Sequence, residues 1–147
     1  MRRSAIEALV LLTCGLLAAL YAAEVPQPAM TPRIGVLFPA TLATSSHLLD
    51  AFLQGLRESG YIDGENMVLE VRAADGRQER LPDLASELVR LKVDVIVAGS
   101  TPGAFAAKNA TGTIPIVIVL TGDPVASGLV SSLARPGGNL TGVTTIS

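Results

Sequence analysis

The stretch Val93-Asp94-Val95-Ile96-Val97-Ala98-Gly99-Ser100-Thr101-Pro102-Gly103 decides the fold. It begins with a short apolar run rich in β-branched residues, which is typical of a strand buried on both faces of a sheet. A small polar turn follows, and residues 102–108 are predicted as a helix, with Ser100 or Thr101 as its N-cap and Pro102 at the first position. Such a helix N-terminus offers an anion free N–H groups and the positive end of a dipole. Since ligands of open α/β sheets bind at the carboxyl ends of strands, we expect a ligand at this turn.

Strands and helices alternate on both sides of this stretch. Apolar runs predict strands at 34–38, 66–72, 114–120 and 140–146, and helical spacing predicts helices at about 47–59, 78–91 and 125–134. Alternation of this kind makes a parallel sheet with right-handed crossovers and helices on both faces. The fold class is therefore α/β, a three-layer α/β/α, doubly wound, five-stranded parallel sheet in the order 2-1-3-4-5.

The first 32 residues differ from the rest of the chain. Residues 1–23 combine a basic start with an uncharged apolar run, as in a secretory signal peptide. The run from Ala8 to Ala23 is shorter than the roughly 20 residues of a spanning helix. The residues at the expected cleavage site do not match the usual pattern. Cleavage of the segment and its retention as an N-terminal anchor are therefore both open. Lipidation at Cys14 is a third, less favoured alternative. Residues 24–32 are predicted as a linker and residues 33–147 as a single α/β lobe. The signal-like start predicts a periplasmic or otherwise extracytoplasmic location.

Three loops are expected to share the rim at the carboxyl ends of the first, third and fourth strands. These loops, 39–46, 99–103 and 121–124, carry many hydroxyl groups and one acid, Asp123. Such a rim suits a small solute whose carboxylate is bound by hydroxyl and backbone N–H groups and whose ammonium is bound by Asp123. Each candidate also has a purely structural interpretation. Ser100 and Thr101 can act only as helix caps, and Asp123 before Pro124 can simply initiate a turn.

Several segments together resemble a known family. These are Arg33-Ile34-Gly35-Val36-Leu37, the segment 50–61 (DAFLQGLRESGY), Gly122-Asp123-Pro124-Val125 and the segment 132–142 (SLARPGGNLTG). They are similar to the TrpX-like substrate-binding proteins of ABC importers, which are related to the periplasmic binding protein type I fold. The resemblance covers essentially everything after the linker. It implies an extracytoplasmic receptor that hands a small solute, in some members an aromatic amino acid, to a permease in the membrane.

The resemblance also implies a ligand site and a missing half. The family's ligand loops point to Ser45, Ser46, Ser100, Thr101 and Asp123. Family members continue into a second α/β lobe, with the ligand between the lobes. This sequence ends at about the first crossover, so we expect it to correspond to the N-terminal lobe, with the second lobe absent.

Other classes of function lack the residues they need. The sequence has no nucleophile–base pair, no GxGxxG, P-loop or GxSxG motif and no clustered metal ligands, so we expect no enzyme, no cofactor and no metal. The only His, His47, is interpreted as a solvated helix-start residue. A net charge of −2 argues against nucleic acid as a partner. The alternative to transport is an extracytoplasmic ligand-sensing module of a signalling system, because fold does not separate the two functions.

Overall fold

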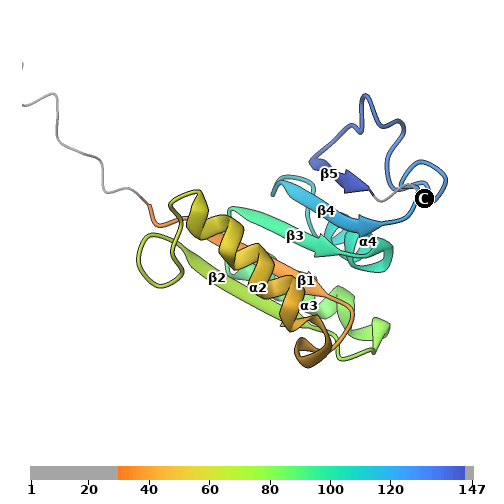
Figure 1. Cartoon of the computed structure of the whole chain (residues 1–147). Helices are drawn as coiled ribbons and strands as arrows, with labels where there is room; N and C mark the ends of the chain where they lie inside the picture. The colour runs from red at the N-terminus through yellow and green to blue at the C-terminus, as the bar shows by residue number, and fades with distance from the viewer. Residues whose placement is uncertain (1–29, 145–147) are drawn as a thin grey trace, which may run out of the picture. The chain divides into compact units, whose positions relative to one another are not determined.

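A five-stranded parallel sheet forms the centre of the protein (Figure 1). The computed structural model describes residues 30–144. The strands are β1 (Arg33–Phe38), β2 (Val68–Ala73), β3 (Val95–Gly99), β4 (Ile116–Thr121) and β5 (Leu140–Thr144). Their order is β2-β1-β3-β4-β5, which confirms the predicted topology. β1 lies between β2 and β3, with Val36 in register with Val71 on one side and Val97 on the other.

Helices cover both faces of the sheet and complete the predicted three layers (Figure 1). α2 (Leu42–Glu58) lies on one face, where Leu49 and Phe52 pack against Val36, Phe38 and Val97. On the other face lie α3 (Leu81–Arg90), which follows the short 3-10 turn η2 (Gln78–Arg80), and α4 (Thr101–Ala110). The larger apolar cluster of the protein is on this second face.

Close packing of α3 onto the sheet depends on Gly35 in β1. A Cβ added at this position would lie 3.1 Å from both Leu88 methyl groups and 3.3 Å from Val93 Cγ2. The side chain of Leu88 is completely buried. Glycine at position 35 therefore leaves the space that the Leu88 side chain fills.

One helix boundary differs from the sequence-based prediction. α2 begins at Leu42 rather than at about His47, because Thr41 is extended and its Oγ1 accepts a hydrogen bond from Thr44 N at 3.2 Å. A hydroxyl that binds the N–H of the third helical residue starts the helix there. The predicted 39–46 loop is thus mostly the first turn of α2, and Ser45 and Ser46 are helical residues.

The helix predicted at 125–134 is absent from the structure. The segment after β4 consists of turns, the first of which is closed by Ser127 N donating to the Asp123 carbonyl at 3.1 Å. Gly128 then has a φ of +76°, which ends helical geometry. Leu129 and Val130 are nevertheless buried in the larger apolar cluster, so the apolar pattern of the segment reflects a packed loop.

The remaining segments carry predictions that the structure leaves open. The signal or anchor at 1–23 and most of the linker at 24–32 lie outside the described residues. Within residues 30–144, none of the helices has the length and apolar character that crossing a membrane requires.

Candidate functional site

The carboxyl ends of β1 and β3 frame a pocket of about 130 Å³. It lies where α2 and α4 both begin, because each helix follows one of these two strands directly. Apolar groups make up most of its wall, and Ser45 and Ser100 are its only hydroxyl-bearing residues. The lining residues are Phe38, Pro39, Ala40, Ser45, Leu48, Gly99 and Ser100.

Ser45 reaches this pocket from the first turn of α2. Its backbone N–H donates to the Thr41 carbonyl at 3.1 Å, which fixes the turn. The residue is only 5% exposed, and within residues 30–144 its hydroxyl has no hydrogen-bond partner. Because buried hydroxyl groups are almost always hydrogen-bonded, an unpaired one at a pocket is suited to a ligand.

Ser100 reaches the same pocket as the N-cap of α4. Its φ of 76° and ψ of 160° lie in a region that residues other than glycine rarely occupy. Ser100 N donates to the Val119 carbonyl at 3.1 Å, which ties this strained residue to β4. Its Oγ accepts a long hydrogen bond of 3.4 Å from Gly103 N. Backbone strain of this kind is concentrated at functional sites, so it supports Ser100 as a candidate ligand-binding residue of the pocket.

The N-terminus of α4 offers fewer free amides than an ordinary helix. Pro102 has no N–H, Gly103 N is bonded to Ser100 Oγ, and Ala104 N donates to the Ser100 carbonyl at 3.0 Å. The N–H of Thr101 is therefore the amide left at this end. An anion bound here would depend on this amide, on the hydroxyl groups and on the positive ends of two helix dipoles.

The five predicted site residues divide into two groups. Ser45 and Ser100 line the same pocket, as the sequence-based prediction of a shared rim requires. Ser46 does not line it, and its hydroxyl donates to the Ala43 carbonyl at 3.3 Å. Thr101, half-buried at the start of α4, is likewise not among the lining residues.

Asp123 makes the structural contacts that its alternative interpretation predicts. Its Oδ1 accepts hydrogen bonds from Val125 N at 2.9 Å and Ala126 N at 3.0 Å. The carboxylate is exposed and is not part of the wall around Ser45 and Ser100. In the described chain Asp123 acts as the cap of the first turn after β4.

Sequence reasoning missed the apolar part of the pocket. From the sequence, Phe38, Pro39, Ala40 and Leu48 are predicted only as parts of a strand, a loop and a helix. The available signal was the position of Phe38 and Pro39 at the end of the first strand. Leu48 fits the helical spacing, and only the structure shows that its side chain is 36% exposed. An exposed apolar side chain beside a strand end is typical of a ligand wall.

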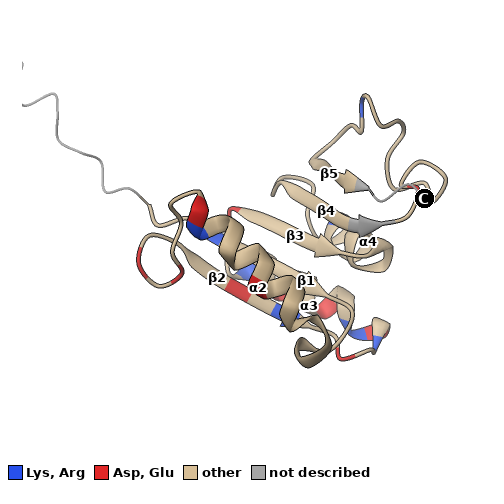
Figure 2. Ribbon diagram, in the orientation of Figure 1, with Lys and Arg blue, Asp and Glu red and all other residues tan. Residues whose placement is uncertain are grey.

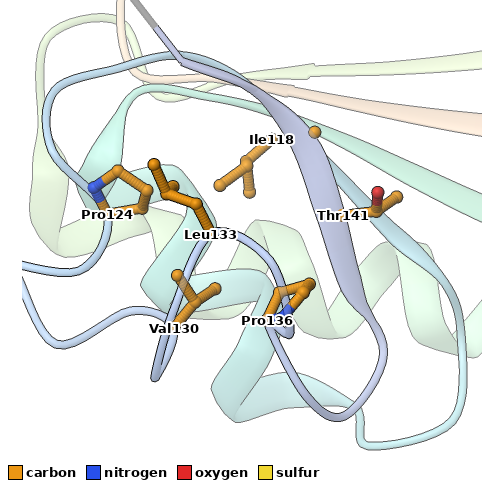
Figure 3. A pocket seen from close by; sticks show the side chains of 7 residues that line it. Ile118, Pro124, Val130, Leu133, Pro136 and Thr141 are labelled. Atoms are coloured by element: carbon orange, nitrogen blue, oxygen red, sulfur yellow. The ribbon is translucent and has the colours of Figure 1, made fainter. Parts of the chain in front are cut away.

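A second, smaller pocket of about 70 Å³ shares no residue with the first (Figure 3). Apolar side chains from β4 and from the segment after it line most of this pocket. The lining residues are Ile118, Pro124, Val130, Leu133, Pro136, Thr141 and Gly142. No hydroxyl of the predicted site reaches it, and no group of His, Cys, Asp or Glu side chains in residues 30–144 is arranged to hold a metal ion.

Comparison with known proteins identifies the family of the chain. The model of the family described as ABC transporter substrate binding protein matches residues 34–147. The chain belongs to this family. Its members bind substrates rather than convert them, which confirms the expectation that the chain is not an enzyme, and the family confirms the sequence resemblance.

Relatives in this substrate-binding family are considerably longer than the chain. A curated protein named tyrosine-binding protein, from Clostridioides difficile (strain R20291), is 44% identical over 91 residues, which are 62% of this chain and 26% of that protein. A ligand-free, open substrate binding protein with adhesive properties from Clostridium difficile is 35% identical, with a TM-score of 0.73 over 79% of this chain and 39% of the other. An ABC domain in complex with L-Trp from Streptococcus pneumonia is 30% identical, with a TM-score of 0.71 over 78% and 38%. The chain thus spans well under half the length of these relatives.

Proposed function

We propose that the chain supplies one wall of the solute site of an extracytoplasmic ABC transporter binding protein. The solute is a small carboxylate with an apolar, aromatic body, such as an aromatic amino acid, and it is handed to a permease in the membrane. The observation that carries this proposal is the buried hydroxyl of Ser45, which has no hydrogen-bond partner in the described part of the chain, beside the strained Ser100 at an apolar pocket.

The apolar wall supports an aromatic body for the solute. Phe38, Pro39 and Leu48 present a ring face and aliphatic groups, and no charged residue lines the pocket. An aromatic ring gains free energy from burial against such a wall, whereas a charged body would be desolvated without compensation. The name of the tyrosine-binding relative and the L-Trp bound to the streptococcal one agree with this solute class.

The helix ends support a carboxylate on the solute. Ser45 and Ser100 supply two hydroxyl groups, and α2 and α4 direct the positive ends of their dipoles toward the same region. Each charge-assisted hydrogen bond contributes about 1.5–3 kcal/mol. No cationic side chain is needed when two helix N-termini and two hydroxyls share the charge.

The size of the pocket supports a site that needs a second wall. At about 130 Å³ it is smaller than typical small-molecule sites, which enclose about 300–1,000 Å³. The related structures contain more than twice the chain length that is matched here. We therefore expect weak binding to this chain alone, because one wall leaves half of the solute in water.

Fluorescence tests the proposal directly, because the chain contains no Trp. L-tryptophan titrated with the purified protein reports binding through its own indole emission. Tryptamine, which lacks the carboxylate, is expected to bind more weakly than L-tryptophan, and L-alanine is expected not to compete.

Two variants locate the binding site. Ser45→Ala and Ser100→Ala are each expected to weaken binding about tenfold or more, since each removes a hydrogen bond to an anion. Ser59→Ala, an exposed serine at the far end of α2, is the matched control and should bind like the wild type. Wild-type affinity in both pocket variants would exclude these hydroxyl groups from the site.

A further inference from the structure

The two chain segments that form the pocket at the ends of β1 and β3 carry no charge. Residues 34–49 and 95–107 contain no Lys, Arg, Asp or Glu (Figure 2). Every small carboxylate that enters therefore meets the same hydroxyl groups and helix ends, whatever the rest of the solute is. Discrimination between such solutes depends on the shape of the apolar wall, because an apolar wall distinguishes bodies by how well they fill it.

Phe38 and Gly99 lie side by side in this wall. They follow directly on Leu37 and Ala98, which are paired in register between β1 and β3. Val97, two residues before Gly99, belongs with Phe38 to the apolar cluster under α2. Because side chains alternate between the two faces of a sheet, position 99 faces α2 as Phe38 does. Gly99 is thus a position on this face of the sheet that has no side chain.

The ring of Phe38 fills the space that Gly99 leaves. A Cβ added at position 99 would lie 3.3 Å from Phe38 Cδ1 and 3.6 Å from Phe38 Cε1, and the shorter distance would force the ring to move. The backbone of Phe38 is fixed, since its carbonyl accepts a hydrogen bond from Ala74 N at 2.8 Å. The ring is 7% exposed and packs against Val97 and Phe52. The pocket is the unfilled space beside the ring, so a displaced ring would move into it.

We propose that Gly99 is a specificity-determining residue of the solute site, because it holds the Phe38 ring back and so keeps open a slot for one six-membered ring. The slot is the space between Phe38, Gly99 and Leu48, and the inference rests on the function proposed above. An apolar cavity of about 150 Å³ binds one benzene molecule, and this pocket measures about 130 Å³. The agreement indicates that one ring of the solute, rather than its whole body, enters the slot.

A methyl group at position 99 would narrow the slot in two ways. The group itself lies in the wall of the slot, and it displaces the Phe38 ring toward Leu48. The φ of Gly99 is not in the left-handed region, so alanine is compatible with the backbone at this position. Gly99→Ala therefore acts on the slot and not on the course of the chain. A solute with a short aliphatic body does not reach the bottom of the slot and is affected less.

Titration of the isotope-labelled chain with L-phenylalanine and with L-valine, followed through NMR amide shifts, tests the proposal. Gly99→Ala is expected to raise the dissociation constant for L-phenylalanine by about tenfold or more, and that for L-valine by less than about threefold. Gly55→Ala is the matched control, because a Cβ added at that position of α2 has no atom within 4 Å. It should leave both dissociation constants unchanged. Circular dichroism checks that each variant is folded.

A double-mutant cycle with Phe38→Leu shows whether the effect of position 99 passes through the ring. Leucine removes the planar ring and gives way to an added methyl group more easily. In the Phe38→Leu background, Gly99→Ala is expected to change the affinity for L-phenylalanine by less than about threefold. An equal loss of affinity in both backgrounds would overturn the proposal.

Two further results would also overturn the role of Gly99. One is wild-type affinity for L-phenylalanine in Gly99→Ala, and the other is loss of the folded structure in that variant, which would make Gly99 a requirement of folding. Failure of the proposed function has a different signature. In that case the wild-type chain binds neither L-phenylalanine nor L-tryptophan, and the solute site and the slot are both refuted.

Discussion

Replacement of Ser100 separates its backbone strain from its two hydrogen-bonding roles. The φ of 76° and ψ of 160° carry a strain of about 1–3 kcal/mol for any residue except glycine. Ser100→Gly removes this strain. Two effects of the same substitution lower stability. Loss of the N-cap hydroxyl costs a few tenths of a kcal/mol, and the greater chain entropy of glycine in the unfolded state costs about 0.5–1 kcal/mol.

The net change for Ser100→Gly is a gain of about 1 kcal/mol in the free energy of unfolding. Ser100→Ala keeps the strain and loses the cap. Its lost hydrogen bond is long at 3.4 Å, so the expected loss is about 0.5–1 kcal/mol, at the weak end for N-caps. The two variants should therefore differ by about 2 kcal/mol, with the wild type between them.

Urea unfolding followed by circular dichroism measures these differences, with an unchanged dependence on urea as the check that the unfolded states are comparable. In a domain of this size about 1 kcal/mol also shifts Tm by about 4 °C. Both variants remove the hydroxyl, so both should bind L-tryptophan more weakly. A Ser100→Gly protein that is no more stable than Ser100→Ala would refute the assignment of strain to this residue.

Three further predictions concern packing and hydrogen bonds. Gly35→Ala is expected to lower the free energy of unfolding by about 1–3 kcal/mol in urea, because its methyl group overlaps the Leu88 side chain. Gly55→Ala, on α2 with open space around its Cα, is the control and should raise stability by about 0.5–1 kcal/mol. Asn139→Ala removes two donated hydrogen bonds to the loop before β4 and should lower the unfolding free energy by about 1–3 kcal/mol, as a thermal melt would show. Asp123→Asn keeps the capping oxygen and should leave the melting temperature unchanged. If Asp123 contacts the solute's ammonium group, the substitution should lower the affinity for L-tryptophan more than the affinity for its deaminated analogue.

The order of the sheet could be predicted because its signal is local and unambiguous. Val95, Ile96 and Val97 form an apolar, β-branched run that is typical of a strand buried on both faces, and β1 and β4 repeat this pattern. In β2 apolar and charged residues alternate, which also indicates a strand. The start of α2 could not be predicted from apolar spacing alone. Thr41 supplies its cap from within a stretch of small residues, and such a stretch reads equally well as a loop.

For the candidate site, the sequence predicts that hydroxyl groups lie at the strand ends, but it does not predict which of them line the pocket. The rim rule placed Ser45 and Ser100 at strand ends, and both line the pocket. The rule does not determine which hydroxyl group points inward, because that depends on the helical phase of α2. One residue further along the helix, Ser46 turns its hydroxyl back to the Ala43 carbonyl. The helix predicted at 125–134 was wrong for a different reason. Leu129 is buried within a loop, and a buried apolar residue in a loop gives the same sequence signal as one in a helix.

The central position of β1 has a consequence for the time course of folding. β1 pairs with β3 through residues such as Ile34 and Val95, and the nearby bond from Arg33 N to Asp94 Oδ2 spans 61 residues of sequence. Contacts this distant in sequence form slowly, because a long loop must close before they are made. During synthesis β1 emerges first and lacks its inner neighbour until the segment around Val95 has also left the ribosome. The centre of the sheet therefore cannot close until β3 has been made, and β1 must wait for its partner through the synthesis of α2, β2 and α3.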